Sequence, residues 1–449
     1  MTNNNSYMKM TILRSCLIII ATLTLIQTKT TAQNTIDCPF SGASADGSDC
    51  NNTIITAVPF LRIVPDARFG GMGDVGIAMP ADANSMHFNA SALTFAPKDF
   101  SISATFTPWL RALGLNDVFL AYLSAYKQVD YFQTIGASLR FFSLGQIQYT
   151  DDQGNPLQTV RPNEFELAIA YSRKLGKEFS VGFTPKYIFS NLGTGAVSGG
   201  QNMRPAHGFA ADLSFTFRKQ MQIGKQREDL KDQKNAIFTA GLAFSNIGTK
   251  VSYTQSANRD YIPANLGLGF SFEYQFDKHN SIVVGLDINK LLVPTPVRRL
   301  QYDEDGNLLT DSNGDPIENP NYDATGGNPS GPDGIADYKQ QSVPASIFSS
   351  FGDAPGGAGE EFSELMWSVG LEYWYNKQFA VRFGHYNEHK FKGNRKFFTV
   401  GLGIRYKIFN INFSYLIPSQ AGQRNPLDNT LRFSVMFDFG KAPDKKKRK

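Results

Sequence analysis

The sequence has little histidine, no marked excess of charge of one sign, and no long hydrophobic run beyond its N-terminus. Basic and acidic residues number 44 and 40, a balance that gives no reason to expect a nucleic-acid partner. Three of the five histidines, His87, His207 and His279, are scattered without a partner in view. Glycine and proline recur too often for long helices, and no later segment is apolar enough for a transmembrane helix.

The one apolar run lies at the N-terminus and predicts export. Lys9 and Arg14 precede CLIIIATLTLI, and small residues follow it. This pattern is typical of a signal peptide, here residues 1–33, cleaved near Ala32 or Gln33. An uncleaved anchor helix is the alternative, but the run is about half of the roughly 20 residues that a membrane span needs.

Two cysteines follow the predicted cleavage site. Cys38 and Cys50 lie in DCPFSGASADGSDC. In an oxidising compartment they could close a short disulfide loop. A zinc site would need more ligands than this stretch offers, so the stretch favours a disulfide.

Strict alternation of apolar and polar residues dominates the chain from Asp99 onward. In NTLRFSVMFDF the apolar set is Leu431, Phe433, Val435, Phe437 and Phe439, and Arg432, Ser434, Met436 and Asp438 stand between them. A period of two is the pattern of a strand with two different faces. Fourteen such segments follow one another, at 99–107, 117–126, 131–143, 163–174, 179–190, 207–218, 236–246, 262–276, 280–290, 363–375, 378–387, 396–407, 409–416 and 429–439.

The connections between these segments alternate in length. KQVD, LGKE, DKHN, NK and the break around Ile408 are tight turns, whereas the intervening links are long and rich in Gly, Asn, Asp and Pro. The charged stretch 219–235 is the exception, and a short helix or a flexible periplasmic excursion is expected there. Strands of about ten residues with this arrangement predict an all-β fold, a 14-stranded antiparallel transmembrane outer-membrane β-barrel over residues 99–439. A soluble β-sandwich also alternates, but it does not need fourteen regular segments.

Charge is segregated along the predicted barrel. The stretch 302–364 carries thirteen acidic residues against Lys339 alone, and most of it lies in a long insertion at 291–362. The tail 440–449 carries six basic residues against Asp444. If the short turns are periplasmic, as in bacterial barrels generally, both termini are periplasmic and the acidic insertion is extracellular.

Residues 34–98 precede the first strand and are rich in small residues. Gly71-x-Gly73-x-x-Gly76 matches a dinucleotide-binding pattern, but these glycines follow Pro65 and Asp66 instead of an uninterrupted strand. Glycine also allows close backbone approach to a wall. We therefore expect a plug or hatch that occupies or caps the periplasmic side of the lumen, with its close contacts at Gly70, Gly71, Gly73, Gly76 and Asn89.

The same segment carries a resemblance. ARFGGMGDVGIAMPADANSMHFNASAL is similar to the N-terminal signature of FadL-like outer-membrane barrels, although Asn89-Ala90-Ser91 lacks the proline of their Asn-Pro-Ala motif. AVPFLRIVPDARFGGMGDVGIAM, followed by PWL at Pro108–Leu110, resembles the PorV family of the type IX secretion system.

The resemblance implies a non-enzymatic role in protein secretion. PorV-like barrels dock on the large translocon barrel, take up cargo by its C-terminal domains, and deliver it to the PorU-like sortase at the cell surface. The alternative is a FadL-like channel for hydrophobic solutes, which predicts a greasy lumen pocket. An enzyme is not expected, because neither a Gly-x-Ser-x-Gly elbow nor a converging Ser, His and acid set is present. We expect outer-membrane lipid to surround the barrel.

Two loops hold candidate binding residues. Four large apolar residues in TPWLRALGL should face water and are predicted to bind cargo, namely Trp109, Leu110, Leu113 and Leu115. Folding back over the barrel mouth, or a place in the outer-leaflet interface, is the alternative for them. In the acidic insertion, Asp311, Asn313 and Asp315 have calcium-loop spacing, although Pro316 replaces the required glycine; a solvated loop is the alternative to a structural calcium.

HYNEH, from His385 to His389, matches a zinc-protease pattern that requires a helix. Here the motif ends a predicted strand, where residues four apart are separated by roughly 13 Å. A structural or loop role is therefore favoured over zinc binding.

Overall fold

The computed structural model describes residues 52–443 apart from 111–113, 116, 151–152, 154, 196, 199–200, 224–233, 256–258, 298–299, 302–308, 320–321, 323–335, 356 and 420–429. The predicted signal peptide at 1–33, Cys38, Cys50 and the predicted cargo residue Leu113 lie outside the described residues, as does the end of the basic tail.

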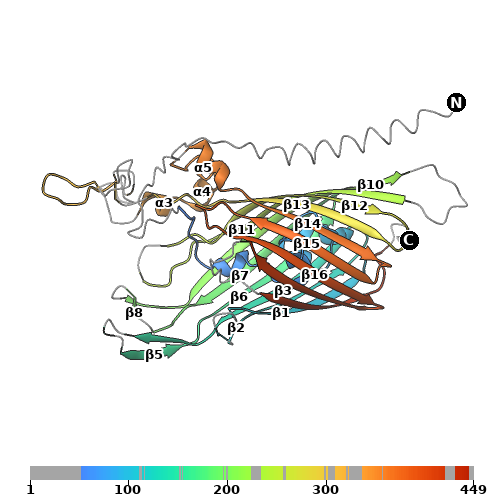
Figure 1. The fold of residues 1–449 in the computed structure, drawn as a ribbon, viewed down its shortest axis with the longest axis horizontal. Coiled ribbons are helices and arrows are strands. Elements are labelled where there is room, and N and C mark those ends of the chain that lie inside the picture. The colour runs from blue at the N-terminus through green and yellow to red at the C-terminus, as the bar shows by residue number, and fades with distance from the viewer. Residues whose placement is uncertain are drawn as a thin grey trace, which may run out of the picture. The chain divides into compact units, whose positions relative to one another are not determined.

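Within the described residues, fourteen strands pair antiparallel into a closed barrel in the order β1-β18-β17-β16-β15-β14-β13-β12-β11-β10-β7-β6-β3-β2 (Figure 1). They are β1 (Phe100–Pro108), β2 (Val118–Gln128), β3 (Gln133–Leu144), β6 (Asn163–Lys174), β7 (Phe179–Asn191), β10 (Ala206–Ile223), β11 (Lys234–Gly248), β12 (Asn265–Gln275), β13 (Ser281–Leu291), β14 (Met366–Tyr375), β15 (Phe379–Asn387), β16 (Lys396–Tyr406), β17 (Phe409–Pro418) and β18 (Leu431–Phe439). The predicted all-β, 14-stranded barrel is confirmed, each predicted segment corresponding to one of these strands.

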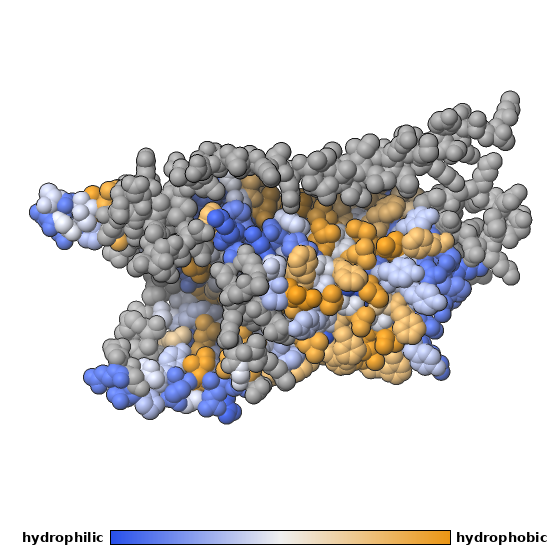
Figure 2. All heavy atoms as spheres, in the orientation of Figure 1, coloured by the Kyte–Doolittle hydropathy of each residue, from blue (hydrophilic) through white to orange (hydrophobic). Residues whose placement is uncertain are grey.

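The two faces of each strand have the predicted polarity. On β18, Leu431 and Phe433 point outward and are 49% and 38% exposed, whereas Arg432 and Ser434 point inward and are 2% and 0% exposed. Figure 2 shows hydrophobic side chains gathered over the middle of the barrel wall, with hydrophilic side chains toward its ends. Closure pairs β1 with β18, from Phe100 opposite Phe439 onward, so neither strand has an open edge.

Short turns join the strands at one end of the barrel, at 129–132, 175–178, 276–280, 376–378 and 407–408. Their sequences explain their tightness. The Asp130 carboxylate accepts hydrogen bonds from the backbone amides of Phe132 (2.7 Å) and Gln133 (2.9 Å). Asn376 and Lys377 both have φ of 51°, the left-handed pair that a tight hairpin requires. We call this side the turn end.

The opposite side, the loop end, carries the long connections and several elements that the sequence reasoning missed. Two small hairpins form there, β4 (Ile147–Thr150) with β5 (Pro156–Val160) and β8 (Val197–Ser198) with β9 (Gln201–Asn202). The acidic insertion contains three short helices, α3 (Asp337–Gln340), α4 (Val343–Ser349) and α5 (Ala358–Ser363). Among the described helices, none is long and apolar enough to cross a membrane.

The expectation for 219–235 was wrong where the structure describes this stretch. β10 extends to Ile223 and β11 starts at Lys234, and the ladder continues between them from Lys219 opposite Phe238. Residues 219–223 and 234–235 therefore extend a strand pair instead of forming a helix or loop, because backbone pairing in a hairpin tolerates polar side chains once both faces meet water. Residues 224–233 lie outside the described part.

Candidate functional site

The N-terminal segment runs through the lumen from the loop end to the turn end. At the loop end, the backbone amide of Asn52 donates to the carbonyl of Phe391, between β15 and β16 (2.9 Å). At the turn end, the Tyr126 hydroxyl donates to the carbonyl of Lys98 (3.1 Å). Figure 1 draws the segment in blue inside the barrel. The expected lumen segment is therefore present, but it runs from one end of the lumen to the other instead of being confined to one end.

The segment forms four short helical turns, and the last three begin at a side-chain cap. These are η1 (Pro59–Arg62), α2 (Ala67–Gly70), η2 (Ala83–His87) and η3 (Ala90–Phe95). Asp66 caps α2 by accepting from the amides of Arg68 and Phe69, and Asp82 forms a capping box with Ser85 at the start of η2. Because no turn exceeds six residues, their packing against the wall, and not helix propensity, holds them in place.

The glycines of GGMGDVG touch the barrel wall. A Cβ at Gly71 would lie 3.0 Å from the Cα of Gly401, and one at Gly384 on β15 would lie 1.9 Å from the nitrogen of Gly73. Gly73 also has φ of 69°, a left-handed conformation that favours glycine. Two further close contacts involve Gly70 with Arg432 and Gly76 with Phe88. These glycines therefore serve close packing of the plug, and no strand leads into them as a dinucleotide fold requires.

Asn89 links two parts of the segment to the wall. Its Nδ2 donates to the carbonyl of Ile77 (2.8 Å) and to Thr216 Oγ1 on β10 (2.9 Å). Its Oδ1 accepts from the amide (3.1 Å) and hydroxyl (2.6 Å) of Ser91. Asn89 is 1% exposed, so losing it would leave buried donors and acceptors unpaired.

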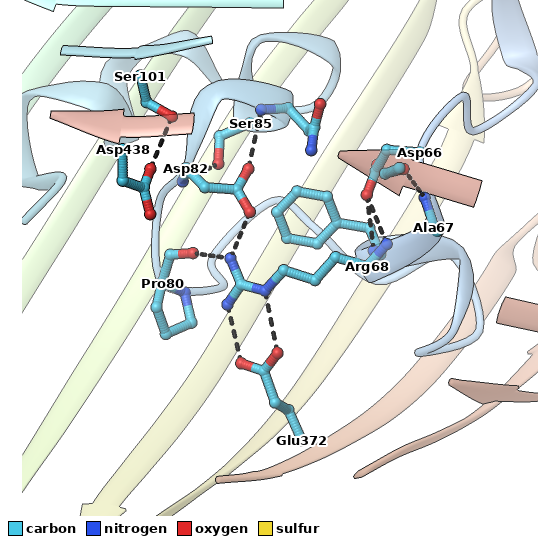
Figure 3. A network of polar contacts seen from close by, with 12 residues as sticks. Asp66, Ala67, Arg68, Pro80, Asp82, Ser85, Ser101, Glu372 and Asp438 are labelled. Carbon is cyan, nitrogen blue, oxygen red and sulfur yellow. Dashed lines mark hydrogen bonds and ion pairs between the residues drawn. The ribbon is translucent and has the colours of Figure 1, made fainter. Parts of the chain in front are cut away.

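A buried ion-pair network fastens the middle of the plug (Figure 3). Arg68 donates to both carboxylate oxygens of Glu372 on β14 (3.0 and 2.8 Å) and to Asp82 Oδ2 (2.7 Å). Glu372 also accepts from Arg382 Nε on β15 (2.7 Å). Burial of a charge is tolerated only with such partners. The sequence analysis missed this network, although Glu372 is a charged residue within the predicted strand 363–375, which could have indicated a buried partner.

A second charged cluster lies nearer the loop end. Arg140 on β3 donates to the carbonyl of Leu61 (3.0 Å), and its Nη2 lies 2.5 Å from His87 Nδ1. Burial, and then the charge of Arg140, lower the pKa of His87 well below its usual range, so this histidine is neutral at pH 7. Lys186 pairs with Asp212 at 2.7 Å. Each of these groups has a partner in the plug or wall.

Two polar-lined cavities remain in the lumen. One of about 110 Å³ is lined by Asp74, His87, Lys186, Asn246 and Arg395, among others. The other, about 360 Å³, lies toward the turn end, among Lys98, Arg218, Glu273, Lys377 and Arg405. Within the described residues, no three His, Cys, Asp or Glu side chains gather in a way that could hold a metal. The lumen thus resembles a packed protein interior with buried charges more than an apolar pocket for a solute.

Comparison with protein families identifies the chain. The family described as type IX secretion system protein PorV matches residues 46–298, more than half of the 449 residues. The chain belongs to the PorV family. The matched range covers residues 46–98 of the N-terminal segment and the first nine strands of the barrel. A search of curated proteins finds no match.

Solved structures to which the chain is similar include two toluene transporters and a FadL homologue. The Pseudomonas putida toluene transporter TodX is 13% identical with a TM-score of 0.44, over 84% of this chain and 98% of its own. The Ralstonia pickettii toluene transporter TbuX is 10% identical with a TM-score of 0.41, over 83% and 98%. A Pseudomonas aeruginosa FadL homologue is 10% identical with a TM-score of 0.36, over 87% and 100%.

The predicted cargo residues of this PorV-family barrel differ in exposure. Trp109 is half-buried, with its ring 5.3 Å from that of Phe142, and Leu110 packs against the same cluster. Both fold back over the mouth, the alternative raised from the sequence. Leu115 remains 41% exposed.

Sequence reasoning missed a more exposed residue at this mouth. Ile55 is 80% exposed and lines a cavity of about 290 Å³ with Val58, Phe142, Leu144 and Tyr253. We call this cavity the mouth groove. The sequence feature that could have indicated this groove is the isoleucine pair in NNTIIT, which precedes the first strand.

The two other sequence motifs form turns and surface contacts. Asp311 Oδ1 accepts from the amides of Asn313 (2.8 Å) and Asp315 (2.9 Å), so the carboxylate closes a tight turn. Calcium binding there stays a prediction. His385 faces outward between the rings of Trp367 (5.2 Å) and Phe398 (4.5 Å), whereas His389 contacts Phe391 beyond the strand. The favoured structural role of HYNEH agrees with these contacts.

Proposed function

We propose that this PorV-family barrel binds secreted cargo through the cargo's C-terminal domains at the translocon and delivers it to a PorU-like sortase. Family membership is the observation that carries the proposal. The filled lumen supports it. The N-terminal segment is held in the lumen by buried ion pairs and close glycine contacts, so the outer surface is the region available for binding other proteins. The protein is then a binding partner of a large translocon barrel and not an enzyme.

The orientation follows from the loop lengths. Short turns are periplasmic in bacterial barrels, so we place the turn end and the C-terminal tail in the periplasm and the loop end outside the cell. Asn52, the first described residue, then lies at the extracellular mouth. The expectation that both termini are periplasmic is thus kept for the C-terminus, and the N-terminal residues lie outside the described part.

The mouth groove and Leu115 are the proposed contacts for cargo. Apolar side chains that face water usually mark an interaction surface, and Ile55 and Leu115 are both exposed at the loop end. Trp109 and Leu110 support the groove from below through their contacts with its walls. Leu113, outside the described residues, remains a predicted member of this surface.

A detergent pull-down of the tagged protein, followed by mass spectrometry, tests the function. We expect a very large barrel and secreted proteins that share a C-terminal domain. The double variant Ile55→Ser/Leu115→Ser should lose the cargo while retaining barrel assembly, and Leu175→Ser, 63% exposed at the turn end, serves as the matched control. Recovery of only lipid or fatty acid with the wild-type protein would reject the proposal.

The alternative, a FadL-like channel for hydrophobic solutes, makes a different prediction for the lumen. It requires an apolar pocket, whereas the two cavities described above have more charged and polar residues than apolar ones in their linings. Planar-bilayer recordings separate the two. Deleting 70–89 should raise single-channel conductance from a closed baseline if this segment is the plug, and an unchanged, closed barrel after the deletion would rule out that role.

A further inference from the structure

The helix α5 contacts the mouth of the barrel, where Asn52 Nδ2 donates to Glu360 Oε1 (2.8 Å), and it also lies against the outer wall. Lys290 follows the outward residues Val284, Leu286 and Ile288 of β13 at the same spacing of two, yet it is only 6% exposed. Its Nζ donates to Glu361 Oε2 (2.9 Å) and Glu364 Oε2 (2.5 Å), in and just after α5. These two ion pairs hold α5 against the outside of β13 at the loop end (Figure 1).

An apolar cavity of about 700 Å³ lies between α5 and the wall. The wall contributes Leu266 and Leu268 of β12 and Ile288 of β13, and the insertion contributes Phe351, Phe362 and Leu365. Lys290 and Glu361 stand at its margin as the charged groups. Such a space differs from the polar cavities of the lumen in both lining and location.

The wall side of this cavity belongs to the band that faces the hydrocarbon. Leu268 is 40% exposed, and the next outward residues of β12, Phe270 and Phe272, are 41% and 44% exposed. In a membrane barrel this outward apolar band contacts acyl chains. A chain that lies along β12 can therefore enter the cavity without leaving an apolar surface.

The side of the cavity that Phe351 and Phe362 form, which we call the cover, is apolar as well. Phe362 and Phe351 are 73% and 52% exposed, although their segment lies in a loop region that is otherwise rich in acidic residues. Two exposed phenylalanines at one site form an apolar surface that a bound chain would cover favourably. Aromatic side chains also gather where the hydrocarbon meets the headgroups, which is the level of the loop end.

We propose that the cavity between α5 and β12–β13 binds an acyl chain of an outer-leaflet membrane lipid. The chain lies against Leu266, Leu268 and Ile288 and is covered by Phe351 and Phe362. The Lys290 ion pairs with Glu361 and Glu364 keep the cover closed. The lipid site is independent of cargo binding, because the mouth groove is lined by a different set of residues.

Native mass spectrometry of the full chain, purified in detergent from outer membranes, tests the proposal. The wild-type protein should retain one lipid with the mass of an outer-membrane lipid. Leu268→Trp fills the cavity and should lower the retained fraction by about tenfold, because the larger side chain takes the space that the acyl chain would occupy. Leu139→Trp, on the outward face of β3 and 42% exposed in the wild type, is the matched control and should retain the lipid.

A second variant guards against misfolding. Phe362→Ser removes the cover without touching a strand, and it should release the lipid while heat-resistant migration of the barrel is unchanged. Equal lipid retention in Leu268→Trp, Phe362→Ser and wild type would overturn the proposal. So would a bound free fatty acid, or a protein that occupies the site in place of lipid.

Discussion

Arg68 and Glu372, 304 residues apart in the sequence, form two hydrogen bonds inside the barrel, from Nε to Oε2 (3.0 Å) and from Nη2 to Oε1 (2.8 Å). Glu372→Gln should lower the free energy of unfolding by about 3–5 kcal/mol, because it leaves buried arginine charge uncompensated. Urea titration of the barrel in lipid vesicles measures this. In a double-mutant cycle, Arg68→Gln should cost less in the Glu372→Gln background than alone; strictly additive costs would contradict the pairing.

Gly384 should tolerate no side chain. Its Cβ would lie 1.9 Å from the nitrogen of Gly73 and 2.0 Å from the carbonyl carbon of Met72, both backbone atoms. Gly384→Ala should therefore displace the plug and lower the unfolding midpoint, at a cost of about 1–3 kcal/mol or more. Gly176→Ala, where no atom lies within 4 Å of the new Cβ, is the control. Equal midpoints for the two variants would refute the close packing.

Stability of the plug should depend on the protonation of Asp66. Burial, and then the charge of Asp82, raise the pKa of Asp66 to about 7. A carboxyl with a raised pKa stabilises the fold below its unfolded pKa near 4, and this contribution is lost as pH rises through 7. Stability should fall between pH 4 and 7 by on the order of 1 kcal/mol per unit.

Asp66→Asn isolates this effect. Asparagine caps a helix about as well as aspartate, so the variant should keep the α2 cap and lose the pH dependence. The measurement is the difference between wild-type and variant urea midpoints across pH 4–8. A difference that does not change with pH would show that Asp66 does not titrate in this range.

The N-terminal part of the plug should be reachable from outside the cell. Ile55 is 80% exposed at the loop end. In a Cys38→Ser/Cys50→Ser background, Ile55→Cys should react with a membrane-impermeant maleimide on intact cells, whereas Lys377→Cys at the turn end should react only after the outer membrane is opened. The reverse pattern would invert the proposed orientation.

The barrel could be predicted from the sequence because the alternation of polar and apolar residues that marks each strand is a local pattern. Each residue of a strand such as β18 faces either lipid or lumen, so polarity alternates with a period of two and marks the strand. The short helix α5 could not be predicted in this way. Its place depends on the ion pairs of Lys290 with Glu361 and Glu364, which lie 71 and 74 residues away in the sequence.

The candidate site was only partly predictable. GGMGDVG and Asn89 indicated close packing, because glycine allows close backbone approach and asparagine is a preferred helix cap, whatever the distant parts of the chain do. The full length of the plug and the partner of Arg68 depend on which strands surround the lumen. The sequence left the place of Trp109 open for the same reason, since Phe142, its contact, lies on another strand.

The central claim is that cargo binds at the loop end of a closed barrel. Photo-cross-linking in secreting cells tests it most directly, with a photoreactive amino acid placed at Ile55 in the mouth groove or at Lys377 at the turn end. We predict that Ile55 cross-links to the C-terminal domain of secreted proteins and that Lys377 does not. Cargo cross-linked from Lys377, or from neither position in an assembled complex, would contradict the claim.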